Sequence, residues 1–255
     1  GMNPRSHFGS SHYTSCCGDS SRGRGACVSS TVCTERAPTS PCAVCRAAMA
    51  IKFRDDPMGG ELELDPKSDG LKVLRNKPQP GVVSKEVSKV VFSAEAVRKF
   101  GGKGHWYELR CDDFSLGNVV IIGLGFTTTD PETLKDMDLP TRAFNIPKTW
   151  MIGYTRSCWW DGERQEITDA FAKLKPFNSF PVGVLATPEG SLHMYIHRRL
   201  VASIDPTEYG FQPIPTDEPL FAVVDFAGAV RKASLLPSSL PPADDEGEAG
   251  KEDGG

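Results

Sequence analysis

Apolar and polar residues alternate with a period of two over much of the chain between residues 51 and 237. The clearest cases are residues 106–111 (WYELRC) and 192–197 (LHMYIH), in which apolar side chains recur at every second position. Successive side chains of a β-strand point to opposite faces of its sheet, so this period predicts half-buried strands.

Three further segments are apolar at almost every position. They are residues 118–126 (NVVIIGLGF), 181–187 (PVGVLAT) and 220–226 (LFAVVDF), and such runs are expected of central strands that are covered on both faces. Turn-forming pairs such as Gly101-Gly102 and Asp205-Pro206 separate the strands at intervals typical of antiparallel sheets. The pattern therefore predicts an all-β fold, an antiparallel β-sandwich of two sheets.

Helical signals are few. Residues 130–135 (DPETLK) place an Asp N-cap and a first-turn Pro ahead of a good helical sequence, which predicts one or two helical turns. Apolar residues at i, i+4 and i+7 within 167–174 predict a second short helix that begins near Asp161 or Gly162. We expect one or two short helices and no repeat architecture.

The two ends of the chain differ in composition from its middle. Residues 1–50 are dominated by Ser, Gly, Cys, Arg and Thr, and residues 238–255 become acidic and rich in Gly. Neither segment has enough apolar surface to offset the entropy lost on ordering. We therefore expect one domain at residues 51–237, a disordered leader at 1–50 and a disordered acidic tail at 238–255.

Charge and cysteine usage narrow the classes of partner. A formal net charge of −4 and a pI near 5.8 give no basic surface of the kind that nucleic acid requires. No run approaches the roughly 20 apolar residues of a membrane-spanning helix, and the N-terminus lacks the apolar core of a secretory signal. Only Cys111 and Cys158 lie in the predicted domain, so we expect a reducing, cytoplasmic location.

Two motifs have features of cofactor sites. Cys42 and Cys45 form a C-x-x-C knuckle with Cys27 and Cys33 upstream, and paired thiolates are zinc ligands. No second C-x-x-C or His pair follows, so these four cysteines are weak zinc candidates. The Gly123-Leu-Gly125 segment lacks the third glycine and the following helix of a dinucleotide site, and glycine there lets a central strand pack closely. We expect no cofactor.

The sequence also contains only weak candidates for catalytic residues. Cys111 and Cys158 would need a neighbouring base to act as nucleophiles, and the sequence indicates none. The carboxylate pairs Asp55-Asp56 and Asp112-Asp113 fall at predicted turns, where Asp binds its own backbone. We therefore expect that the protein is not an enzyme.

Aromatic and arginine residues, which dominate binding hot spots, concentrate between residues 150 and 164. Trp150 is expected in the core, whereas adjacent Trp159 and Trp160 cannot both point inward from one strand. The basic run at 197–199 lies at a predicted hairpin, as a solvated turn or as a contact for an acidic peptide or phosphate. The candidate partner-binding residues are Tyr154, Arg156, Trp159, Trp160, Arg164, His197, Arg198 and Arg199.

Several segments, in this order, resemble the Neuralized homology repeat (NHR) family. The most specific is Ile122–Pro131 (IGLGFTTTDP). Val90–Ser93 (VVFS) and Trp106–Leu109 (WYEL) precede it, and Pro219–Gly228 (PLFAVVDFAG) follows. Residues 150–156 and the insert after them resemble most the small adaptor branch of the family, that of neuralized-like protein 2 (Ozz).

The resemblance implies a concanavalin-like sandwich, related in shape to SPRY domains, that binds a peptide segment of a partner protein without catalysis. It also implies adaptor duty, with ubiquitin-ligase components among the partners. Two departures stand out: residues 197–199 (HRR) replace the family's usual Asn-Gly turn, and no SOCS box or RING finger follows the domain in the printed sequence. The alternative is a lectin-like or small-ligand-binding β-sandwich, which a glycan array would distinguish.

Overall fold

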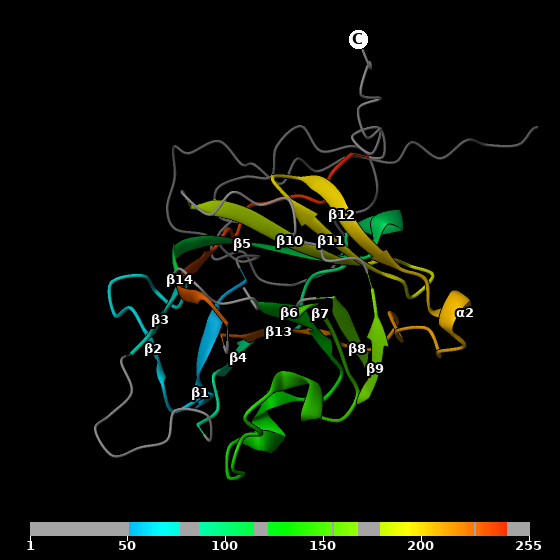
Figure 1. The fold of residues 1–255 in the computed structure, drawn as a ribbon. Coiled ribbons are helices and arrows are strands. Elements are labelled where there is room, and N and C mark those ends of the chain that lie inside the picture. Colours follow the sequence, from blue (N-terminus) through cyan, green and yellow to red (C-terminus); the bar gives the residue numbers. More distant parts are fainter. Residues whose placement is uncertain are drawn as a thin grey trace, which may run out of the picture. The chain divides into compact units, whose positions relative to one another are not determined.

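The computed structural model describes residues 51–76, 87–114, 122–154, 156–167, 179–226 and 228–243. Within these residues, two antiparallel sheets of seven strands each pack face to face (Figure 1). The predicted all-β sandwich is confirmed. The predicted leader and residues 244–255 of the predicted tail lie outside the described residues, so their expected disorder stays a prediction.

The first sheet is the lower one in Figure 1 and has the strand order β1-β4-β13-β6-β7-β8-β9. Its strands are β1 (Phe53–Met58), β4 (Val90–Ser93), β6 (Gly123–Thr127), β7 (Thr149–Tyr154), β8 (Ser157–Trp160), β9 (Glu163–Glu166) and β13 (Phe221–Asp225). Central strands β4, β6 and β7 are buried along their whole length, as their continuous apolar sequences require.

The second sheet has the order β12-β11-β10-β5-β14-β3-β2. Its strands are β2 (Leu62–Leu64), β3 (Lys72–Arg75), β5 (His105–Phe114), β10 (Phe180–Ala186), β11 (Leu192–Ile196), β12 (Arg199–Ile204) and β14 (Val230–Leu235). In β11, inward residues are buried and outward residues are half-exposed, which confirms the period of two in the sequence.

The last two strands of the chain occupy interior positions in the two sheets. β13 pairs with β4 on one side and β6 on the other, and β14 pairs with β3 and β5. Within their sheets, β4 is thereby joined to β6, and β3 to β5, by strands from the C-terminal part of the domain.

A single apolar core fills the space between the sheets, and one polar group within it links them. Tyr107 of β5 points across this core, where its hydroxyl accepts a hydrogen bond from the Gly125 amide at 2.9 Å and lies 3.2 Å from the Val223 carbonyl. Its neighbours Leu109 and Cys111 face the same core together with Trp150, so the prediction that Trp150 is a core residue is confirmed.

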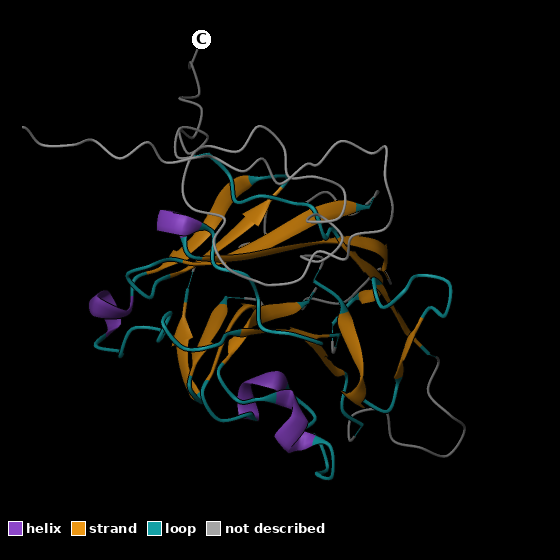
Figure 2. Ribbon diagram, turned by 180° about the vertical axis from the view of Figure 1, so that it is seen from behind, coloured by secondary structure: helices purple, strands orange, loops and turns teal. Residues whose placement is uncertain are grey.

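The outer face of the first sheet is covered by the connection between β6 and β7. This connection contains two 3-10 turns, η2 (Pro131–Leu134) and η3 (Ala143–Asn145), which lie below the lower sheet in Figure 2. Asp130 caps the first turn by accepting a 2.9 Å bond from the Glu132 amide, which confirms the predicted helical start. Beneath the turns, Met151 and Tyr154 belong to a second apolar cluster.

The second predicted helix is wrong at its start. Asp161 and Gly162 have φ of 47° and 87° and form the two-residue turn between β8 and β9, the Asp-Gly geometry that favours a tight hairpin. Strand β9 then occupies the expected first helical turn, and residues 168–178 lie outside the described part. The other short helices are η1 (Gly101–Lys103) and α2 (Pro206–Tyr209), the latter capped by Asp205.

Two glycines in β6 are required by close packing. A β-carbon on Gly125 would lie 1.8 Å from the Trp150 carbonyl oxygen, and one on Gly123 would lie 2.4 Å from the Tyr154 ring. The interpretation of this segment as a closely packed central strand is confirmed.

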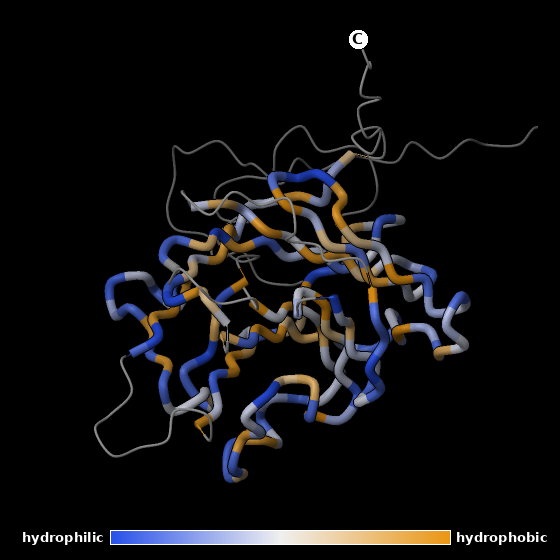
Figure 3. The backbone as a smooth tube through the Cα atoms, in the orientation of Figure 1, coloured by the Kyte–Doolittle hydropathy of each residue, from blue (hydrophilic) through white to orange (hydrophobic). Residues whose placement is uncertain are grey.

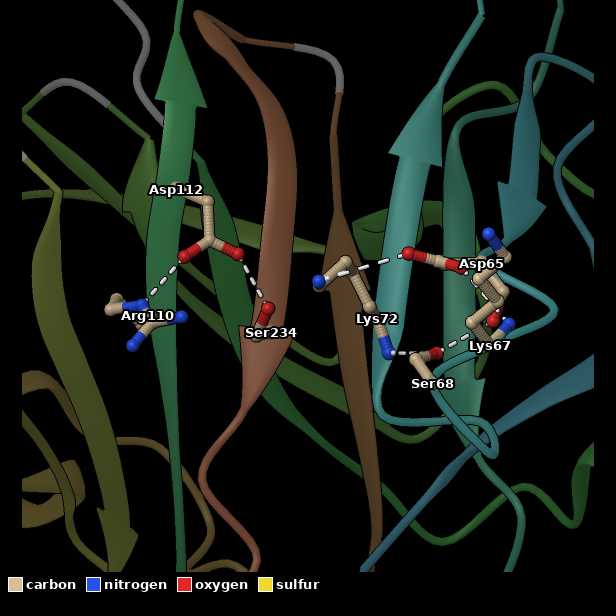
Figure 4. A network of polar contacts seen from close by, with 7 residues as sticks. All are labelled: Asp65, Lys67, Ser68, Lys72, Arg110, Asp112 and Ser234. Carbon is tan, nitrogen blue, oxygen red and sulfur yellow. Dashed lines mark hydrogen bonds and ion pairs between the residues drawn. The ribbon is translucent and has the colours of Figure 1, made fainter.

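The aspartate pairs lie in strands, which corrects their expected place in turns. Asp55-Asp56 belongs to β1 and Asp112-Asp113 to β5. Figure 4 shows Asp112 between its two partners: it accepts a 2.6 Å bond from Arg110 Nε and a 2.5 Å bond from Ser234 Oγ of β14. The bond from Ser234 joins β5 to β14, and both contacts are structural.

Candidate functional site

The eight candidate partner-binding residues fall into three places. Tyr154 and Trp160 lie in the interior, Arg156, Trp159 and Arg164 lie on the first sheet, and residues 197–199 lie at a hairpin of the second sheet.

Tyr154 is a structural residue of the second apolar cluster. Its hydroxyl donates a 2.6 Å hydrogen bond to Asp225 Oδ2, which also accepts a 3.1 Å bond from the Ala143 amide. Burial, reinforced by the Asp225 carboxylate, raises the pKa of Tyr154 well above its ordinary range. The side chain ties β7 to β13 and η3 and is not available to a partner.

Trp160 is also buried. Its indole nitrogen donates a 2.7 Å bond to the Gln212 carbonyl, and its ring stacks on Phe211 with centroids 5.7 Å apart. The one hydrogen-bonding group of this side chain is satisfied inside the fold, so Trp160 is not available to bind a partner.

Trp159 and Arg164 form a cross-strand pair on the outer face of the first sheet. They are directly opposite in the β8–β9 register, so their side chains are neighbours. The Trp159 ring stacks on Phe144 with centroids 3.7 Å apart and planes 4° apart. Arg164 Nε donates a 3.0 Å bond to Ser157 Oγ. We call Arg156, Ser157, Trp159, Arg164 and Glu166 the β8–β9 face.

The edge of this face is strongly polar. β9 is the edge strand of the described sheet and has the sequence ERQE, seen as a hydrophilic segment in Figure 3. Arg156 is exposed in the preceding turn with φ of 52°, and Arg164 lies 3.7 Å from the Glu166 carboxylate. Charges on an edge strand oppose unspecific strand pairing, so the side chains of the face, more than its backbone, are suited to recognition.

The basic run forms the turn between β11 and β12. His197 and Arg198 have φ of 51° and 63°, and Ile196 pairs with Arg199 across a two-residue turn. The left-handed geometry that Asn-Gly usually supplies is therefore present here with larger side chains. Arg198 folds back over the sheet, where its guanidinium lies 3.4 Å from the Glu108 carboxylate.

The two basic turns lie on separate sheets. The turn with Arg156 lies where β13 ends, because the Tyr154 hydroxyl reaches Asp225. The turn with His197 lies beside the start of β10, where the His197 amide donates a 3.0 Å bond to the Pro181 carbonyl.

Burial makes the two cysteines of the described residues poor nucleophiles. Burial raises the pKa of Cys158 to about 11 and raises that of Cys111 further, and both are free thiols. Among the described residues, no group of three or more His, Cys, Asp or Glu side chains could hold a metal ion. The weak zinc candidates Cys27, Cys33, Cys42 and Cys45 lie outside the described residues, so zinc binding by them stays untested.

Among the described residues, no helix combines the length and the apolar character needed to cross a membrane.

One covered surface, on the second sheet, was not predicted from the sequence. Trp106 and Glu108 point outward from β5, yet each is only 3% exposed, because residues 236–243 lie over them. The run Leu240-Pro241-Pro242 has no periodicity that would signal packing, and the domain was expected to end at Pro237. The one signal in the sequence was Trp106, a large aromatic residue at an outward position of an alternating strand, which indicates that another segment covers it.

Comparison with known proteins places the fold. A family model described as Neuralized matches residues 82–237. The crystal structure of the neuralized-nhr1 domain of Drosophila melanogaster superimposes with a TM-score of 0.52 at 19% identity, covering 74% of this chain and 99% of that one. The solution structure of the NEUZ (NHR) domain in Neuralized from the same organism gives 0.51 at 19% identity, covering 74% and 92%.

At this level of identity the two structures establish the fold, which agrees with the NHR resemblance in the sequence. No curated protein matches the chain. The family model covers residues 82–237, more than half of the 255 residues. This chain belongs to the Neuralized family, and its β-sandwich is an NHR domain.

Proposed function

We propose that the protein is a non-catalytic adaptor whose NHR domain binds a peptide segment of a partner protein on the β8–β9 face. The observation that carries the proposal is the Trp159–Arg164 pair, an aromatic anchor and a guanidinium held side by side on a rigid sheet. Trp and Arg are the residue types that contribute most to binding hot spots.

The geometry keeps the cost of binding low. Trp159 is already held flat against Phe144, and Arg164 is already oriented by Ser157. Little side-chain entropy is then lost when a ligand arrives. An apolar side chain packed on Trp159 with a nearby carboxylate facing Arg164 or Arg156 matches this arrangement.

The finer assignments rest on the resemblance in the sequence. We infer adaptor duty toward ubiquitin-ligase components and kinship with the neuralized-like protein 2 branch from the motifs around residues 150–156. We also infer a cytoplasmic location and a domain that spans residues 51–237, onto which residues 238–243 pack. The free thiols of Cys111 and Cys158 fit a reducing compartment.

Peptide-display selection on the full chain, followed by calorimetry with the selected peptide, tests the site. We expect Trp159→Ala and Arg164→Ala each to weaken binding at least about tenfold, equivalent to about 1.4 kcal/mol. Lys67→Ala, a charge removal in the exposed β2–β3 turn, is the matched control and should bind as the unaltered chain does.

Thermal unfolding of each variant separates loss of binding from loss of fold. Equal affinity of Trp159→Ala, Arg164→Ala and Lys67→Ala would place the ligand elsewhere. A glycan array that responds while peptide libraries remain blank would favour the lectin-like alternative.

A further inference from the structure

The outer face of the second sheet is crossed by the chain that follows β14. We call residues Leu236–Ala243 the C-terminal strap. Its first residue donates from the Leu236 amide to the Glu108 carbonyl at 2.9 Å, and further along Trp106 Nε1 donates to Ser239 Oγ at 2.9 Å. The strap therefore covers Trp106 and lies across β5.

Beyond Ser239, side chains of the domain donate hydrogen bonds to carbonyls of the strap. Arg198 donates from Nη2 to the Leu240 carbonyl at 2.5 Å, and Lys103 donates from Nζ to the Pro242 carbonyl at 2.8 Å. Pro241 and Pro242 have no backbone N–H, so this part of the strap offers mainly carbonyl acceptors. The face supplies the donors that such a segment needs.

The floor beneath the strap is aromatic and fixed. A β-carbon on Gly183 would lie 2.0 Å from the Trp106 ring, so the absence of a side chain there lets the indole pack directly against β10. Tyr195 of β11 meets Trp106 edge to face with centroids 5.5 Å apart. Aromatic floors with polar donors at their rim are typical of surfaces that bind proline-rich, extended segments.

The strap does not fill this surface. A hollow of about 610 Å³ lies beside Pro242 over Leu185, His193 and Tyr195. The family match ends at Pro237, so the residues that occupy the middle of the surface lie outside it.

We propose that the outer face of β5, β10 and β11 is a docking groove for a proline-rich segment of a partner protein, closed in this chain by its own residues Ser239–Pro242. The groove is on the opposite sheet from the β8–β9 face and stands independently of it. The partner is recognised through its carbonyls, as the strap is, and through proline rings that pack on the aromatic floor.

Because the strap is tethered to the domain, its effective concentration determines how much it weakens the binding of a competing peptide. With an effective concentration of about 1 mM and an intrinsic dissociation constant of about 0.1 mM, the strap would weaken a competing peptide about tenfold. Loosening the strap should restore that affinity.

The test uses the full chain and a fluorescent peptide with the sequence of residues 236–243 (LPSSLPPA). Fluorescence polarisation should show at least about tenfold tighter binding to the variant Ser239→Ala/Pro241→Gly/Pro242→Gly than to the unaltered chain. Adding Lys103→Ala and Arg198→Ala to that variant should abolish the gain, whereas adding Lys67→Ala should leave it. A peptide with all prolines replaced by alanine should bind neither chain.

Thermal unfolding confirms that each variant is folded at the assay temperature. Two results would overturn the proposal: a folded, loosened variant that binds the peptide no better than the unaltered chain, or binding that persists without Lys103 and Arg198. The outcome is separate from that at Trp159 and Arg164, whose variants should bind the LPSSLPPA peptide as their parent does.

Discussion

The hydroxyl of Tyr154 donates a 2.6 Å hydrogen bond to Asp225 Oδ2 within the fold, where Asp225 is fully buried. Tyr154→Phe would leave that carboxylate with one donor fewer, and an undersatisfied buried charge is costly. We expect the free energy of unfolding to fall by about 2 to 3 kcal/mol, measured by urea denaturation.

Tyr209→Phe is the matched control, because Tyr209 is half-buried near the surface beside Phe211. It should change the free energy of unfolding by less than about 0.5 kcal/mol. Equal losses in the two variants would show that the Tyr154–Asp225 bond contributes nothing specific.

Gly125 can be tested by the addition of one methyl group. Gly125→Ala would drive its β-carbon into the Trp150 carbonyl, and a backbone atom in a central strand cannot move aside cheaply. The free energy of unfolding should fall by at least about 2 kcal/mol. Gly102→Ala has no atom within 4 Å of the added carbon and should be neutral or slightly stabilising; a harmless Gly125→Ala would contradict the packing of β6.

The left-handed arginines at two turns should respond oppositely to Asn. Arg156 and Arg198 have φ of 52° and 63°, and Asn tolerates this region better than Arg does. Arg156→Asn should therefore raise the free energy of unfolding by about 0.5 kcal/mol. Arg198→Asn should lower it, because the nearly buried Glu108 carboxylate loses its ion-pair partner. Denaturant melts that move in the same direction would refute this contrast.

The reactivity of Cys158 should report its burial. Its pKa rises from the ordinary 9.0 to about 11, which lowers the thiolate fraction near neutral pH about 100-fold. Alkylation by iodoacetamide at pH 7.5, followed by peptide mass spectrometry, should be at least about 100-fold slower in the native chain than in urea. Rapid native labelling would revive a nucleophilic role for this residue.

Sequence alternation predicts the orientation of many side chains correctly. Adjacent Trp159 and Trp160 point to opposite faces of β8, as the period of two requires, and the first meets Phe144 while the second enters the core. The family motif at Ile122–Pro131 likewise coincides with β6 and the turn that follows it. Local periodicity suffices wherever a strand is regular.

Irregular strands and non-local contacts explain the failures. Alternation would place Tyr154 with Trp150 in the central core, but the register shifts between Met151 and Tyr154, with Gly153 at φ of 97°, and Tyr154 joins the outer cluster. The covering of Trp106 by Ser239 depends on residues 133 positions apart. No local pattern encodes such a pairing.

The interior positions of β13 and β14 have a consequence for biosynthesis. Until residues 221–235 have left the ribosome, β13 is not available to pair with β4 and β6, and β14 is not available to pair with β3 and β5. Nascent chains must therefore hold several unpaired apolar strands in solution until β13 and β14 have been synthesised, a state that favours aggregation and chaperone binding. A stop codon just before Phe221 should consequently yield insoluble protein rather than a smaller folded unit.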